Sequence, residues 1–191
     1  MGDFMRALFF VVSLMFSQAN AFETFKLSES SLGPLNEKTQ ANLWQIKKLF
    51  KGYKVKTDTF FMDGEASGET FRILQGDEIL LEINANTVGA TYIYSVIILD
   101  PKIKTPDGIH LGSKLEDLVA LKVLGNCTRG AEEAEHEVRC TAKGGSNFGY
   151  AFLISAEEEE KTEPGSPVEI AIQPKRRILS GLTWHPPRKL K

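Results

Sequence analysis

Residues 91–99 read Thr-Tyr-Ile-Tyr-Ser-Val-Ile-Ile-Leu and are apolar at nearly every position. A short run of this kind, without polar alternation, is typical of a strand that is covered on both faces in the middle of a sheet. The following residues, 100–108, contain two prolines and predict a rigid connection leaving this strand. Asp100 and Asp107 lack the spacing of a calcium loop, and the lysines between them argue against a cation site.

Short strands are predicted on both sides of this run. After Gly52 the sequence alternates polar and apolar residues, which indicates a half-buried strand over residues 53–59. Further strand candidates are residues 70–74, 78–83, 136–142, 148–154, 168–172 and 178–184, with turns at Gly76-Asp77 and Gly144-Gly145. We therefore expect a mainly antiparallel sheet.

Two short helices complete the predicted elements. Residues 36–52 carry apolar side chains at helical spacing, with Asn36 placed to cap the first turn. Ser113 and Glu116 have the spacing of a capping box at the start of a second helix. Since no repeat and no domain boundary is visible, the prediction is a single α+β domain.

The first residues of the chain predict export. Arg6 precedes a ten-residue apolar run at residues 7–16, and the small residues Ala19 and Ala21 then stand two apart before Phe22. This is the pattern of a secretory signal peptide, and the apolar run is shorter than the roughly 20 residues that cross a bilayer. We expect residues 1–21 to be removed and residues 22–191 to form one domain in the periplasm or outside the cell.

The two cysteines are expected to pair. Cys127 and Cys140 are the only cysteines of the chain, and an isolated pair in an oxidising compartment indicates a disulfide. The alternatives are two free thiols or half of a metal site, but a zinc site usually contains close Cys-x₂₋₄-Cys pairs, which this sequence lacks.

Charge limits the choice of partners. The 191 residues carry 23 basic and 25 acidic side chains, a net charge of −2, which does not favour nucleic acid. Residues 156–167 are acidic and then turn-rich, which predicts a solvated loop. Residues 186–191 form a basic tail with Arg188, Lys189 and Lys191, for which we expect at most weak contact with a membrane surface.

No catalytic motif is found. His110, His136 and His185 are dispersed along the sequence, and no metal-ligand spacing, nucleophile elbow or phosphate loop accompanies them. We therefore expect a protein that is not an enzyme and has no cofactor and no metal. A serine, histidine and aspartate site assembled from distant positions is the enzymatic alternative, because such triads are recognised by geometry.

A series of short segments resembles a known family. The segments are Gly33-Pro34-Leu35-Asn36, Leu99-Asp100, residues 105–108, Gly112, Asp117-Leu118, Gly125-Asn126-Cys127, residues 138–142 and Tyr150-Ala151-Phe152. Over residues 33–155 this order resembles small, uncharacterised Gram-negative envelope lipoproteins under extracytoplasmic (sigma-E) stress control. The resemblance implies a periplasmic α+β domain with both cysteines bridged, and no established activity, ligand or partner. This chain has no lipidation cysteine at Phe22, and residues after 155 look like additions.

These observations lead to one main functional hypothesis and two alternatives. The main hypothesis is an exported, non-catalytic binding or accessory protein of the cell envelope, connected with stress, whose partner the sequence does not identify. One alternative is an inhibitor of a lysozyme-like hydrolase, since such inhibitors are small exported β-rich domains with a disulfide. The other is an envelope hydrolase with a site built from scattered Ser, His and Asp residues.

Overall fold

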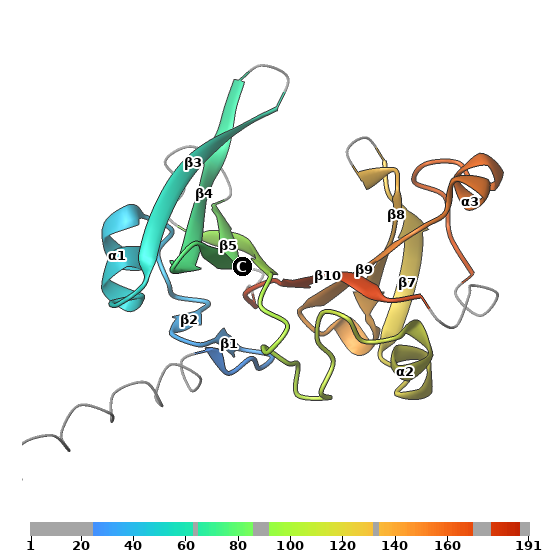
Figure 1. Cartoon of the computed structure of the whole chain (residues 1–191), viewed down its shortest axis with the longest axis horizontal. Helices are drawn as coiled ribbons and strands as arrows, with labels where there is room; N and C mark the ends of the chain where they lie inside the picture. The colour runs from blue at the N-terminus through green and yellow to red at the C-terminus, as the bar shows by residue number, and fades with distance from the viewer. Residues whose placement is uncertain (1–24, 63–64, 86–91, 132–133, 170–176, 188–191) are drawn as a thin grey trace, which may run out of the picture.

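The computed structural model describes residues 25–62, 65–85, 92–131, 134–169 and 177–187. Eight antiparallel strands form one sheet in the order β3-β4-β5-β6-β10-β9-β8-β7, as Figure 1 shows. Their bounds are β3 Lys54–Met62, β4 Glu65–Gln75, β5 Glu78–Ala85, β6 Ile93–Ile98, β7 Leu124–Arg129, β8 Glu137–Ala142, β9 Phe148–Leu153 and β10 Leu179–Trp184. A small ribbon is formed by β1 Ser31–Leu32 and β2 Leu35–Asn36. The predicted single α+β domain with a mainly antiparallel sheet is confirmed.

The last strand of the chain lies in the middle of the sheet. Strands β3 to β6 follow one another as neighbours and form the N-terminal half, and β7 to β9 form the C-terminal half in the same way. Strand β10 lies between β6 and β9, so that Leu182 stands opposite both Ile98 and Tyr150. In Figure 1 the two halves extend on opposite sides of β10.

The central position predicted for residues 91–99 is confirmed, but their cover is incomplete. Val96 and Ile98 are fully buried on the core face, whereas Tyr92 and Tyr94 are exposed by 40% and 49%. The opposite face of the sheet is polar at this point: Thr70 donates to Asn84 (2.8 Å) and Asn84 donates to Ser95 (3.3 Å), across β4, β5 and β6. The second face of β6 is thus occupied by a row of hydrogen bonds and not by an apolar layer.

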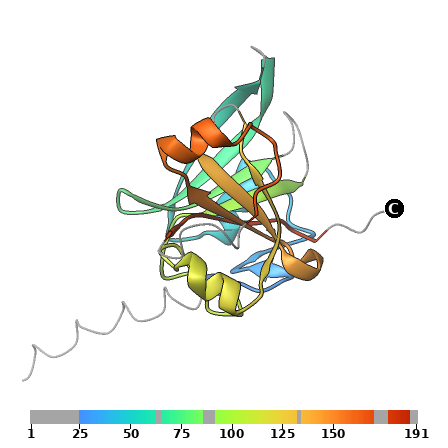
Figure 2. The same cartoon turned by 90° about the vertical axis from the view of Figure 1, so that its right-hand side faces the viewer.

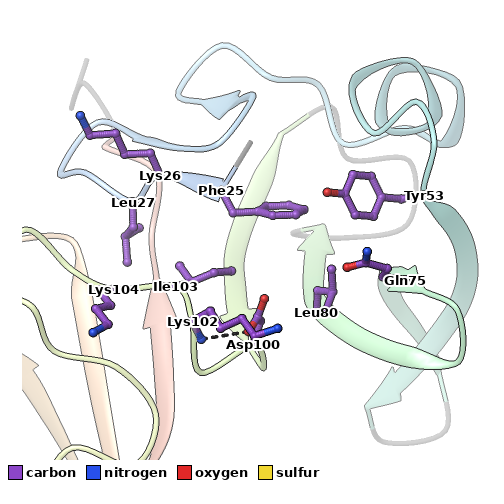
Figure 3. A pocket seen from close by; sticks show the side chains of 10 residues that line it. All are labelled: Phe25, Lys26, Leu27, Tyr53, Gln75, Leu80, Asp100, Lys102, Ile103 and Lys104. Carbon is purple, nitrogen blue, oxygen red and sulfur yellow. Dashed lines mark hydrogen bonds between the residues drawn. The ribbon is translucent and has the colours of Figure 1, made fainter. Parts of the chain in front are cut away.

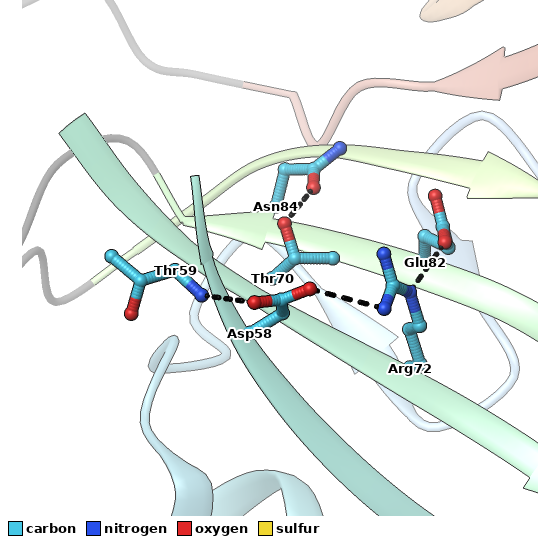
Figure 4. Close-up of polar contacts among 6 residues, drawn as sticks. All are labelled: Asp58, Thr59, Thr70, Arg72, Glu82 and Asn84. Atoms are coloured by element: carbon cyan, nitrogen blue, oxygen red, sulfur yellow. Dashed lines mark hydrogen bonds and ion pairs between the residues drawn. The ribbon is translucent and has the colours of Figure 1, made fainter. Parts of the chain in front are cut away.

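Charged side chains continue this polar face toward the sheet edge. Arg72 on β4 donates to Glu82 on β5 (2.7 Å) and to Asp58 on β3 (3.2 Å), as drawn in Figure 4. The two carboxylates raise the pKa of Arg72 above its ordinary value, chiefly through the hydrogen bond that Arg72 donates to Glu82. Alternation of this kind, polar on one face and apolar on the other, is the usual pattern of an antiparallel sheet with one solvated face.

Both predicted helices exist, but each begins later than expected. Helix α1 spans Leu43–Leu49, and Asn42, not Asn36, caps it by accepting a hydrogen bond from the Gln45 amide (2.9 Å). Asn36 ends β2 instead, because its carbonyl and its amide both bond to Thr39 and close a turn there.

The second helix, α2, spans Leu115–Ala120 and begins one residue later than the Ser113–Glu116 pair predicts. The Asp117 carboxylate accepts from the amide of Lys114, the N-cap residue (3.3 Å). The Ser113 hydroxyl accepts from the His110 amide instead (3.0 Å), so it belongs to the preceding turn.

A third short helix corrects the prediction for the acidic segment. The sequence predicts a loop over residues 156–167, and this is wrong for the first half of the segment, where α3 spans Ala156–Lys161. Figure 2 shows α2 and α3 at opposite ends of the C-terminal half. The predicted tight connection at Gly144-Gly145 is confirmed as a 3₁₀ turn, η3 Lys143–Gly145, in which both glycines have positive φ.

Some predictions fall on residues outside the described ranges. These are the signal peptide 1–21 with Ala19, Ala21 and Phe22, the strand positions Ile170 and Ile172, and the tail residues Arg188, Lys189 and Lys191.

The predicted disulfide is confirmed. Cys127 on β7 and Cys140 on β8 are bonded and stand directly opposite each other in the register of the two strands. No free cysteine occurs in the chain. Because β7 ends the strand order of the described sheet, this bond fastens an edge strand to β8, its neighbour in that order.

The variant Cys127→Ala/Cys140→Ala should lose about 3 kcal/mol of unfolding free energy, because the closed loop between the cysteines no longer restricts the unfolded chain. Urea unfolding followed by circular dichroism measures this loss. Reduction of the unsubstituted protein should give a similar value. A loss below about 0.5 kcal/mol in both experiments would contradict a stabilising role for the bond.

Candidate functional site

A pocket of about 560 Å³ opens on the core side of the N-terminal half. Four separate segments line it, namely Phe25, Lys26 and Leu27 before β1, Tyr53 after α1, Gln75 and Leu80 around the β4–β5 turn, and Asp100, Lys102, Ile103 and Lys104 after β6. Figure 3 shows these side chains around one space. The volume lies in the range of sites that hold small organic molecules.

The interior of the pocket is apolar. Phe25, Leu27, Leu80 and Ile103 are each less than a tenth exposed, so the floor of the pocket belongs to the hydrophobic core, while its other lining residues are partly or fully exposed and the pocket is open to solvent. Phe25 packs against Phe50 with ring centroids 5.8 Å apart and meets Tyr53 edge to face at 5.2 Å. This aromatic group fixes the N-terminal segment over the end of α1.

The connection after β6 forms the opposite wall. The Asp100 side chain accepts from the Lys102 amide (2.9 Å), and the Ile103 amide donates to the Asp100 carbonyl (3.1 Å). These bonds close a turn that directs Ile103 into the pocket, in agreement with the rigid connection predicted there. Leu80 is held beside it, because its carbonyl accepts from the amides of both Leu99 and Asp100.

Polar groups surround the apolar interior. In Figure 3 Tyr53 and Gln75 lie on one side of the pocket and Asp100 lies beside Ile103 and Lys102, while Lys26 and Lys104 direct their ammonium groups away from the apolar side chains. With Lys102, three cations and one carboxylate line the site. The arrangement can receive an apolar body and hydrogen-bond a polar group at one end.

The three histidines do not meet in the structure. His110 hydrogen-bonds the Leu111 carbonyl (2.7 Å), and His185 lies by the Tyr94 carbonyl (3.3 Å). His136 Nδ1 lies 2.6 Å from Glu159 Oε1 on α3, and its Nε2 lies 3.6 Å from Glu135 Oε1. None of the three histidines lines the pocket.

The His136–Glu159 pair has the distance of a catalytic base and the carboxylate that orients it, but not the rest of a triad. A triad histidine presents its second ring nitrogen to the nucleophile. Here the second nitrogen faces the Glu135 carboxylate. The hydrogen bond to Glu159 and the charge of Glu159 raise the pKa of the exposed His136 above its ordinary value, which favours the protonated form and leaves less of the free base to accept a proton.

A buried arginine positions α3 beside this histidine. Arg129 on β7 is only 7% exposed, and its guanidinium donates to the backbone carbonyls of Glu135, Glu159 and Thr162. These bonds tie the acidic segment to the edge of the sheet, where Val168 also donates to the Cys127 carbonyl (2.9 Å). The role of Arg129 is structural, because the guanidinium is satisfied by main-chain oxygens.

Among the residues that the structure describes, no three side chains of His, Cys, Asp or Glu lie close enough to share a metal ion. Within the same part of the chain, no helix has the length and hydropathy needed to cross a bilayer.

The sequence contains no pattern that indicates the pocket. Its residues come from segments far apart in the chain, and Tyr53 and Leu80 each contribute to a strand pattern that conceals any other role. The disulfide was found because two isolated cysteines in a chain with a predicted signal peptide are a sufficient signal. Arg129 gave no signal, since a lone arginine on a strand is usually solvated.

Comparison with known proteins gives a family and a fold. The family model described as "Protein of unknown function (DUF1131)" matches residues 14–164. The crystal structure of the uncharacterized protein yfeY from Escherichia coli aligns with a TM-score of 0.61 and 23% identity, over 84% of this chain and 99% of that one. At this identity the likeness shows the fold alone. No curated protein matches the sequence.

The Glu159→Gln variant should lower the pKa of His136, because the hydrogen bond and charge that raise it are lost. Histidine titration by NMR measures the shift.

The ion pair between protonated His136 and Glu159 stabilises the folded state fully at pH values below 6.5, the ordinary pKa of histidine. This stabilisation is lost as the pH rises through the raised pKa of His136. Glu157→Gln, on the same helix but paired with Lys161, is the control and should leave His136 unchanged. Equal shifts in both variants would contradict the assignment.

Proposed function

Because the chain belongs to the DUF1131 family, whose members have no assigned function, we propose from its own geometry that it is an exported, non-catalytic binding protein of the cell envelope. The observation that carries this proposal is the pocket, with its buried apolar floor and the polar and charged groups that surround it. A site of this composition holds a ligand through burial of apolar surface and orients it through hydrogen bonds.

The pocket itself supports binding over catalysis. A reaction needs a nucleophile or activated water, a base within reach of it and a group that stabilises developing charge. The lining offers one carboxylate, Asp100, and its Oδ1 accepts a hydrogen bond from the Lys102 amide of its own turn. Among the described residues that line the pocket, none is a serine, threonine, cysteine or histidine.

A hydrolase remains the second candidate, and one observation favours it. His136 and Glu159 are 2.6 Å apart, which is the spacing of a base and its orienting carboxylate. If the protein is a binding protein, a gene that encodes the His136→Ala variant should still complement the phenotype of a deletion strain. Loss of complementation by a folded His136→Ala protein at normal abundance would favour the hydrolase.

Periplasmic location and a link to envelope stress are part of the proposal. The signal pattern at residues 1–21 and the bonded Cys127–Cys140 pair support export to an oxidising compartment. The resemblance to sigma-E-controlled envelope lipoproteins supports expression under stress.

The exported protein should begin at Phe22 and carry no lipid, since Ala19 and Ala21 form the cleavage motif and Phe22 replaces the cysteine that lipidation requires. Intact-mass spectrometry of the protein purified from the periplasm tests this. A different first residue or an acyl adduct would contradict it.

The pocket should bind the fluorescent probe anilinonaphthalene sulfonate at one site, because the probe combines an aromatic body with a polar group. Gln75→Trp should reduce this binding at least tenfold, since Gln75 is exposed at the side of the pocket and a larger side chain there narrows the entrance. Lys143→Trp, exposed in the C-terminal half, is the matched control and should bind the probe normally.

Fluorescence titration with direct excitation of the probe measures both variants. Equal affinity of Gln75→Trp and the unsubstituted protein would show that the probe binds elsewhere and would contradict the proposed site.

A further inference from the structure

We propose that the exposed side of α1 docks the protein onto an anionic phospholipid bilayer surface. We call the residues Trp44, Lys47, Lys48 and Lys51 the α1 stripe. Their spacing of three, four and seven residues places successive members on one side of a helix, and Lys51 follows just after the last turn. All four side chains are exposed.

The tryptophan of the stripe packs little against the described part of the chain. Trp44 is 69% exposed, the largest value among the exposed large apolar side chains of the described residues, whereas Trp184 is fully buried. The helix is held to the core from its other side by Ile46 and Phe50, both almost completely buried. A tryptophan that is not needed for packing suits the interface between water and lipid, where its apolar ring and its N–H are both accommodated.

The lysines give this region a local positive charge in a protein whose net charge is −2. Residues 44–57 contain five lysines and no acidic residue, because Lys54 and Lys56 continue the series into β3. Over the part of the chain that the structure describes, none of the ion pairs involves these five lysines. Lys48 lies over the Trp44 ring, with its ammonium nitrogen 5.1 Å from the ring centroid, so charge and aromatic surface stand together.

The residue types favour a bilayer over a protein partner. Lysine acts as a mobile point charge, whereas arginine provides the planar, paired donors that recognise a carboxylate at a fixed position. The basic residues of the stripe are all lysines, and a diffuse anionic surface requires no fixed geometry. None of its residues lines the pocket, so the stripe and the pocket are separate surfaces.

Sedimentation of the exported protein with lipid vesicles tests the proposal. We expect binding to vesicles of phosphatidylethanolamine and phosphatidylglycerol, with a shift of tryptophan emission to shorter wavelength, and no binding to phosphatidylcholine vesicles. Lys47→Gln/Lys48→Gln/Lys51→Gln should weaken binding on the order of 100-fold, since each lysine near an anionic surface contributes about fivefold. Trp44→Phe should abolish the emission shift, because Trp184 is already buried.

Two matched variants make the result specific. Lys114→Gln/Lys122→Gln/Lys143→Gln removes the same charge from three exposed lysines of the opposite half and should bind vesicles normally. Arg188→Gln/Lys189→Gln/Lys191→Gln removes the charge of the C-terminal tail and should also retain most of the binding. The pocket variant Gln75→Trp should bind vesicles normally, so that failure of the pocket and failure of the stripe are distinguishable.

Three outcomes would overturn the proposal. These are no binding to anionic vesicles, equal binding to phosphatidylcholine, and an equal loss of binding in either of the two charge controls. The second would show apolar adsorption, and the third would show a general charge effect or docking through the tail.

Discussion

The backbone pairing of β10 joins two halves of the sheet that share no other strand neighbour among the described strands. Strand β6 ends the N-terminal half and β9 ends the C-terminal half, and β10 bonds to both. The pairing brings Leu182 and Trp184 into the middle of the core, where both are fully buried. Strand β10 is far from β6 in the sequence, so its pairing with β6 carries a considerable cost in loop-closure entropy.

The two halves carry different features on this common sheet. The N-terminal half bears the pocket and the α1 stripe, both of which rest on the packing of Phe25 and Phe50 beneath α1. The C-terminal half bears the disulfide, the buried Arg129 and the histidine pair, each of which fastens the sheet edge or α3. The proposed binding surfaces therefore lie in one half, and the other half is stabilised at its edge by covalent and polar contacts.

The sequence predicted the elements better than their contacts. Strand positions followed from alternation and turn glycines, because those signals are local, and the disulfide followed from cysteine count. The caps of both helices were misplaced, because Asn36 and Ser113, which have the residue type of a cap, instead form hydrogen bonds in the turns before the helices. The helix in the acidic segment was missed because its anchor, Arg129, lies elsewhere in the chain. The pocket was not predictable from patterns, as its wall is assembled from four distant segments.

Native-state hydrogen exchange of the β10 amides tests most directly whether this strand unites the molecule. If it does, the free energy of opening measured at the β10 amides should equal that measured at the β5 and β8 amides. The reason is that β6 and β9 both lose a pairing partner when β10 detaches from the sheet. Exchange of β10 at a clearly lower free energy, while β5 and β8 stay protected, would contradict the account and show two halves that fold independently of their central strand.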